Sequence, residues 1–221
     1  MKKKKDSGKD KLETIAVLFF SIASLFFWES ILVTPIKLFV VLIHETSHAL
    51  TTIFTGGIVE SIDFNSYLSG ITKTKGGSLI LIASSGYLGS LAVGSALFLS
   101  VKKEKFRNRL TIILAVILFL VAVNLIESGT AAFLTICAAA FLFFFPRYLP
   151  DKIVSPVFKF IGITSCLYVI ADIKQDLLTT TLRETDTQIL EYLTGIPALA
   201  IGTAWFLISL IVVYLILKKE F

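Results

Sequence analysis

Charged residues are scarce in this chain. Only 17% of its 221 residues are Asp, Glu, Lys or Arg, whereas 55% are hydrophobic. With a mean hydropathy of +0.84, the chain is too apolar for a soluble domain, and its composition is typical of a polytopic membrane protein. The charges occur in short blocks between apolar runs, which is the pattern expected when helices lie in the lipid bilayer and loops lie in water.

Two further absences narrow the class of protein. No basic stripe with interleaved aromatic residues is present, so the net charge of +5 is better explained by loop Lys and Arg beside lipid headgroups, and we expect no nucleic-acid partner. The only cysteines, Cys137 and Cys166, lie in apolar segments without Cys-x-x-Cys spacing. We interpret them as small buried hydrophobic residues.

The apolar runs predict an all-α polytopic membrane protein with about seven transmembrane helices. A small interfacial β-hairpin is predicted at residues 58–77, between the second and third helices, because polar and apolar residues alternate there around a turn at 66–70. The predicted helices cover residues 14–33, 36–54, 78–101, 110–126, 130–145, 157–178 and 198–217. Small residues in the third of these helices predict close helix packing.

These helices form one integral membrane domain, predicted to cover residues 14–217. Residues 1–13 are predicted to be a charged disordered tail, and residues 218–221 a charged C-terminus. We expect a multi-pass protein of the plasma membrane.

The only two histidines of the chain, His44 and His48, lie in one apolar run at positions i and i+4, with Glu45 beside them. On a helix this spacing places both imidazoles on one face. It is the His-Glu-x-x-His arrangement of zinc hydrolases, which needs two neutral nitrogen ligands and a carboxylate that takes a proton from water. A chance match to hydrogen-bonded helix residues is the alternative. Because ionisable groups are costly inside a bilayer, we instead predict a Zn²⁺ site with Glu45 as the general base.

A zinc site needs at least one more protein ligand. Without a third histidine we expect it to be a carboxylate. Asp172 ranks first because it lies deeper in its apolar run, and Asp176, one helical turn later, ranks second. Asp186 is a loop acid that could fold back over the site, and Glu127 and Glu191 are further candidates. For Asp172 and Asp176, the alternative is a helix end that simply meets water.

These features resemble the site-2 protease family of intramembrane zinc metallopeptidases, in its compact bacterial-type branch. The resemblance covers most of residues 36–206. It rests on His44-Glu-Thr-Ser-His-Ala-Leu50, Phe54-Thr-Gly-Gly57, the polar hairpin, Ser85-Gly-Tyr-Leu-Gly89 and, later in the chain, Asp172 and the stretch from Asp186 to Pro197.

The resemblance implies that His44 and His48 are zinc ligands, that Glu45 is the general base and that a late-helix aspartate is the third ligand. Two features depart from the family pattern. Ser47 stands where many members have Gly, and the Asn-Pro-x-x-Asp-Gly signature around the family aspartate is absent.

The sequence therefore predicts a metalloendopeptidase that cuts peptide bonds in or next to transmembrane segments of membrane proteins. The 58–77 hairpin could bind the substrate as an added strand, or it could be a plain interfacial loop. The alternative functions are transport of an ion along the His/Asp cluster and client binding without cleavage. Transport is disfavoured because most of the predicted helices have no ionisable residue in their interiors, and the presence of Glu45 argues against a non-catalytic protein.

Overall fold

The computed structural model describes residues 7–64, 69–178 and 185–220, and the side chains at positions 7, 9, 169 and 171–178 lie outside this description. Within these residues the chain forms mostly helices and one two-stranded antiparallel sheet. The elements are α1 (Ser7–Phe26), α2 (Thr34–Phe54), β1 (Ile58–Phe64), β2 (Gly70–Lys75), α3 (Leu79–Ser100), α4 (Glu104–Asn124), α5 (Gly129–Tyr148), α6 (Asp151–Leu178), α7 (Asp186–Thr194) and α8 (Ala198–Lys218).

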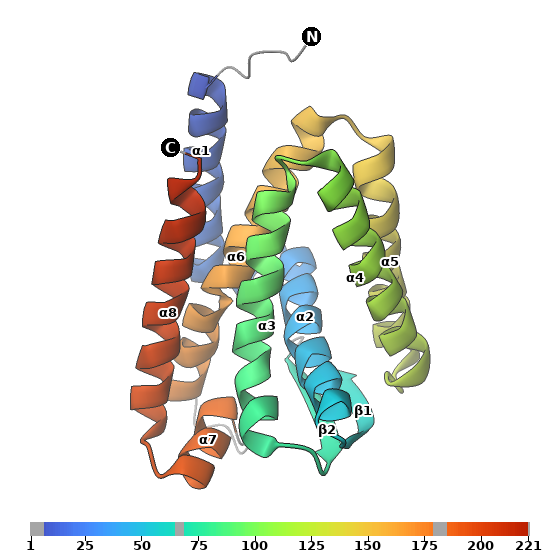
Figure 1. The fold of residues 1–221 in the computed structure, drawn as a ribbon, viewed down its shortest axis with the longest axis vertical. Helices are drawn as coiled ribbons and strands as arrows, with labels where there is room; N and C mark the ends of the chain where they lie inside the picture. The colour runs from blue at the N-terminus through green and yellow to red at the C-terminus, as the bar shows by residue number, and fades with distance from the viewer. Residues whose placement is uncertain (1–6, 65–68, 179–184, 221) are drawn as a thin grey trace.

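Helices α3 and α6 form the centre of the bundle. Helix α2 packs on α3, helices α1 and α8 pack on α6, and α4 and α5 form an antiparallel pair at one side (Figure 1). The predicted small-residue face brings α3 close to α6, because a Cβ atom at Gly94 would lie only 2.6 Å from the carbonyl oxygen of Gly162. The reverse contact, from Gly162 to the carbonyl oxygen of Gly94, would also be 2.6 Å. In lipid, such close backbone approach supplies the packing that holds helices together.

The inward faces of the helices form two apolar clusters. One surrounds the Phe39–Ile43 segment of α2, and the other lies between α1, α3, α6 and α8. Large apolar side chains also face outward, including Phe19, Leu207 and Ile211, which are 66%, 52% and 57% exposed. An exterior of this kind suits a hydrocarbon environment rather than water.

Four of the described helices, α3, α4, α5 and α8, are long and apolar enough to cross a membrane. The predicted count of seven spans is therefore not confirmed. Helix α2 has the length but is less apolar, because His44, Glu45 and His48 interrupt its apolar run. Helix α1 begins in the charged N-terminal segment.

The position of α1 differs from the prediction. It begins at Ser7 and ends at Phe26, whereas a helix over 14–33 was expected, so residues 7–13 of the predicted tail are helical. An ion pair joins this first segment to α6, with Nζ of the buried Lys159 3.0 Å from Oε1 of Glu13.

The end of α1 also has a local cause. The chain turns at residues 27–33. An ion pair links this turn to α2, with Nζ of Lys37 2.8 Å from Oε2 of Glu29. Two further helices begin six residues earlier than predicted. Helix α4 begins at Glu104 rather than 110, and α6 begins at Asp151 rather than 157 and includes Pro156, a residue outside the predicted helix.

The predicted hairpin is confirmed as an antiparallel pair. Ile62 and Thr72 are opposite each other, and the register shifts between Val59 and Ser61. The N–H group of the fully buried Ile62 donates to the carbonyl oxygen of Leu125 at 2.7 Å, which ties β1 to the end of α4. The predicted turn at 66–70 falls mostly outside the described residues.

Helix α7 lies between the predicted helices 157–178 and 198–217, where no helix was expected. A capping box begins it: Oγ1 of Thr185 accepts from N–H of Gln188 at 3.3 Å, and Oε1 of Gln188 accepts from N–H of Thr185 at 3.1 Å. Gly195 ends it with a positive φ of 73°. Thr-x-x-Gln before an apolar run and a following Gly are sequence signals for a short helix.

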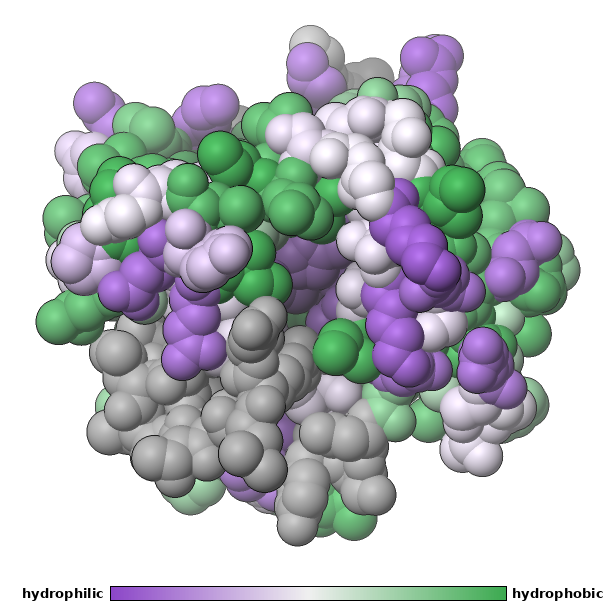
Figure 2. Space-filling model, turned by 90° about the horizontal axis from the view of Figure 1, so that it is seen from below, coloured by the Kyte–Doolittle hydropathy of each residue, from purple (hydrophilic) through white to green (hydrophobic). Residues whose placement is uncertain are grey.

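The hairpin and α7 lie at the same end of the bundle, whereas the first turn of α1 and the last turn of α8 lie at the other (Figure 1). Figure 2 looks onto the hairpin end, where hydrophilic residues lie between hydrophobic ones. The hydrophilic residues of the hairpin include the ion pair between Lys73 and Asp63, whose Nζ and Oδ2 atoms are 2.9 Å apart.

The α3–α6 contact generates a prediction. Because a Cβ at position 94 would overlap the α6 backbone, Gly94→Ala should destabilise the fold by about 1–3 kcal/mol, the typical cost of overpacking. Gly129→Ala is the matched control, since a Cβ there meets nothing within 4 Å. Thermal unfolding in detergent should show a lower midpoint for Gly94→Ala than for Gly129→Ala, and equal midpoints would contradict the packing argument.

Candidate metal centre

The histidine pair lies on the buried face of α2. His44 and His48 are only 5% and 6% exposed, and Glu45 is 3% exposed. The two imidazole rings are 4.7 Å apart between centroids, as expected for positions i and i+4 of a helix. The predicted single-face arrangement of these side chains is therefore present.

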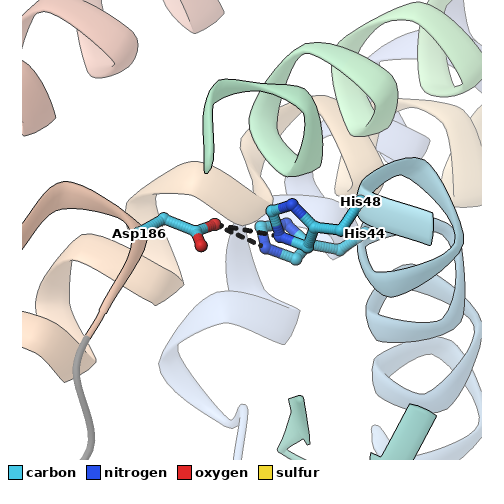
Figure 3. A group of neighbouring side chains, drawn as sticks. All are labelled: His44, His48 and Asp186. Carbon is cyan, nitrogen blue, oxygen red and sulfur yellow. Dashed lines mark hydrogen bonds and ion pairs between the residues drawn. The ribbon is translucent and has the colours of Figure 1, made fainter. Parts of the chain in front are cut away.

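A carboxylate from α7 completes the cluster. Oδ2 of Asp186 lies 3.1 Å from Nε2 of His44 and 3.1 Å from Nε2 of His48 (Figure 3). These atoms lie within 4.8 Å of one another and form a group that could hold a metal ion, the one such group among the described residues. Tetrahedral zinc with bonds of about 2.0–2.1 Å needs ligand atoms about 3.3 Å apart. The two distances from Oδ2 of Asp186 to the imidazole nitrogens are close to that value, and two imidazoles with a carboxylate are a donor set that zinc takes.

His48 is oriented by a backbone carbonyl. Its Nδ1 atom lies 2.7 Å from the carbonyl oxygen of Ile82, in the first turn of α3. Ser85 hydroxyl Oγ donates to the same carbonyl oxygen at 2.6 Å. An Nδ1–H group that donates to this carbonyl leaves Nε2 as the free acceptor, and such second contacts commonly orient a metal-binding histidine.

His44 is held differently. Its Nδ1 atom is buried and has no hydrogen-bond partner among the residues that the structure describes. Two tyrosine rings meet its imidazole edge to face, Tyr87 from α3 and Tyr168 from α6, each with a centroid distance of 5.4 Å. Aromatic packing from two helices therefore fixes the ring plane of His44.

Gly86 leaves room beside both imidazoles. A Cβ atom at this position would lie 2.6 Å from Nε2 of His48 and would also overlap the ring of His44. Gly86 belongs to the small-residue segment of α3, which packs along α2. The space beside the two Nε2 atoms therefore depends on the absence of a side chain at position 86.

The environment of Asp186 favours its charged form. Burial alone would raise the pKa of its carboxyl group, but the neighbouring imidazoles outweigh burial and hold the pKa below its ordinary value. Asp186 is also the first residue of α7, where the helix dipole stabilises negative charge. A charged carboxylate is the form that binds a metal.

The predicted ligands fall into three groups. His44, His48 and Asp186 come together, although the sequence ranked Asp186 below Asp172 and Asp176. The side chains of Asp172 and Asp176 lie outside the described residues, so their ranking stays a prediction.

The remaining acidic candidates are not part of the group. Glu127 and Glu191 are exposed, and Oε2 of Glu191 accepts from the N–H group of Ala198 at 3.2 Å. The capping signal at Thr185 could have given Asp186 a higher rank, because it places this residue at a helix start rather than in a loop.

The bundle, the apolar exterior and the buried His/His/Asp group define a helical membrane protein with a candidate metal centre. The family model described as Peptidase M50B-like matches residues 17–216. The chain belongs to this family, which is a site-2 protease family, and the resemblance found in the sequence is thereby confirmed. No curated protein and no solved structure matches the chain. Family membership implies a metallopeptidase of the membrane, in agreement with the four apolar helices.

The space beside the histidines can be tested directly. Gly86→Ala should lower the zinc content of the purified protein to a small fraction of the Gly129→Ala value, because the added methyl group would occupy the space beside the two Nε2 atoms. Elemental analysis of detergent-purified protein gives the zinc per chain, and thermal unfolding shows whether the variant is folded. A folded Gly86→Ala protein with full zinc content would place the metal elsewhere.

Proposed function

We propose that this protein is a zinc-dependent intramembrane endopeptidase that hydrolyses peptide bonds in or next to transmembrane segments of other membrane proteins. The observation that carries the proposal is the convergence of His44, His48 and Asp186 beside Glu45 in the buried part of the bundle. Membership in a metallopeptidase family supports it.

His44, His48 and Asp186 would hold the zinc ion. When bound, zinc polarises a substrate carbonyl and lowers the pKa of water to near 7. Glu45 follows His44 directly on the same helix and is almost fully buried. Its carboxylate would take the proton of the attacking water and return it to the leaving amine.

The hairpin supports a mode of substrate binding. A helical segment hides its carbonyl groups in its own hydrogen bonds, so it has to be extended before a peptide bond can be cut. The hairpin lies at the same end of the bundle as α7, which carries Asp186 (Figure 1). An extended substrate segment that pairs with the hairpin as an added strand would be presented near the site.

The cellular membrane is also part of the proposal. Four consecutive lysines, Lys2 to Lys5, precede the first helix. A basic cluster beside a membrane helix favours an anionic lipid surface such as that of the plasma membrane. We therefore place the protein in the plasma membrane, where its substrates would be other membrane-spanning proteins.

The ligand assignment predicts a pattern of zinc contents. Wild-type protein should contain about one zinc per chain. His44→Ala and Asp186→Ala should lose most of it, because each change removes a ligand atom. Asp172→Ala and Asp176→Ala should retain it. The measurement is elemental analysis of detergent-purified protein, and loss of zinc from Asp172→Ala with retention in Asp186→Ala would transfer the third ligand to α6.

The proposed base predicts a separation of metal binding from activity. Glu45→Gln should keep its zinc and lose cleavage by about 100-fold to 10,000-fold, because the amide cannot accept the proton. The assay is cleavage of single-span peptides in detergent micelles, followed by mass spectrometry. Glu191→Gln is the control, since this exposed residue lies outside the group and its amide oxygen can still accept from Ala198. Cleavage by Glu45→Gln at the wild-type rate would remove Glu45 from the mechanism.

A further inference from the structure

Strand β2 contacts the Glu45 side chain through the hydroxyl group of Thr72. Oγ1 of Thr72 donates to Oε2 of Glu45 at 2.7 Å. The same hydroxyl lies 3.1 Å from the backbone carbonyl oxygen of Glu45. A hydroxyl has one proton, so the shorter contact, to the carboxylate, is the principal hydrogen bond. The longer contact shows that the Thr72 hydroxyl also lies close to the backbone of Glu45. Among the described residues, Thr72 is the hydrogen-bond donor to this carboxylate.

Gly70 approaches the other oxygen of the same carboxylate. It lies two residues before Thr72, and therefore on the same face of the strand. A Cβ atom at Gly70 would lie 2.6 Å from Oε1 of Glu45, so the strand backbone packs against the carboxylate. One face of β2 thus contacts both oxygens of Glu45, one through a hydroxyl and the other through a glycine.

The hairpin is fixed to the helices on both sides of this contact. Thr72 is opposite Ile62, whose N–H group is bonded to the carbonyl oxygen of Leu125. At the base of the hairpin, N–H of Gly57 donates to the carbonyl oxygen of Thr52 at 2.8 Å. N–H of Ser78 donates to Oγ1 of Thr55 at 3.1 Å. These bonds hold β2 at a defined position relative to α2.

A buried carboxylate needs such a contact. Glu45 has three rotatable side-chain bonds and is 3% exposed, so bulk solvent does not hold its carboxylate in one orientation, and a protein donor is needed. A hydrogen bond to a charged acceptor is roughly twice as strong as a neutral one and selects one orientation of the carboxylate. A general base has to be held within hydrogen-bond reach of the proton that it accepts.

Resting on the proposed function, we propose that Thr72 is a positioning residue for Glu45. Its hydroxyl group holds the carboxylate in the orientation from which it takes the proton. Strand β2 is then a part of the catalytic apparatus as well as a surface for substrate. A purely structural Thr72 would only fill space with its β-branched side chain.

Two substitutions separate these roles. Thr72→Val keeps the shape and removes the hydroxyl, whereas Thr72→Ser keeps the hydroxyl and removes a methyl group. Cleavage of the single-span peptide that wild type cuts fastest gives kcat and KM for each variant. We expect Thr72→Val to lower kcat by about 10-fold to 100-fold, the loss expected for one hydrogen bond to a charged group, with KM and zinc content unchanged. Thr72→Ser should restore kcat to near the wild-type value.

Thr135→Val is the matched control. Thr135 is fully buried in α5, and its hydroxyl donates to the carbonyl oxygen of Ala131 in its own helix. The Thr135→Val variant should therefore have the wild-type kcat. Wild-type kcat in Thr72→Val would overturn the proposal. A Thr72→Ser variant as slow as Thr72→Val, or a change confined to KM, would overturn it as well.

A second measurement does not depend on catalysis. Thermal unfolding midpoints of Thr72→Val, Glu45→Ala and the double variant form a cycle that reports the contact itself. We expect the shifts to be non-additive, whereas the Thr135→Val/Glu45→Ala cycle should be additive. An additive Thr72/Glu45 cycle would overturn the contact and the proposal. If wild-type protein contains no zinc or cleaves no peptide, the proposed function is wrong. The positioning role is then wrong too, even if the Thr72/Glu45 cycle is non-additive.

Discussion

Three ionisable side chains are tolerated inside this apolar bundle because they face one another. His44 and His48 are buried, and both contact one carboxylate oxygen of Asp186, a residue 142 positions beyond His44 in the chain. A buried charge without a partner would cost several kcal/mol. The opposing carboxylate offsets much of that cost, and the same geometry places three ligand atoms around one point.

The rest of the fold serves to bring α7 and the hairpin to α2. Helix α3 provides the surface for this, since it packs on α2, on α6 and on α7. Its small residues act at two different places. Gly94 allows α6 to approach, and Gly86 leaves the space beside the histidines open. Close helix packing and the space beside the candidate metal ligands thus depend on glycines about two helical turns apart on one helix.

The hairpin also packs on the histidine helix, α2. Its register shift, its bond to the end of α4 and its glycine-lined base hold β2 in place. In β2, the hydroxyl group of Thr72 donates to the carboxylate of Glu45.

Local sequence determined the class of the protein, most of its helices and two of the three residues of the candidate metal group. Apolar runs bounded by Gly and Pro specify helices such as α3 and α8, whose predicted limits agree with the structure within one residue. The positions of His44, Glu45 and His48 follow from helical periodicity alone. The hairpin could be recognised for the same reason, because strand alternation is also a short-range pattern.

Contacts between distant segments were decided only by the tertiary structure. Helix α1 begins earlier than predicted, and its Glu13 forms an ion pair with Lys159 of α6, a contact that local composition cannot reveal. Asp186 ranked below the aspartates of α6 because depth in an apolar run was the criterion applied, and the capping signal at Thr185 indicates a helix start but not the segment that this helix meets. Its contact with the histidines depends on where the capping box starts α7 and on how α7 packs against α3 and α8. Residues 44, 48 and 186 come together because the helices that carry them pack in one way. The packing energy is a sum over the whole bundle, so no single one of these positions encodes it.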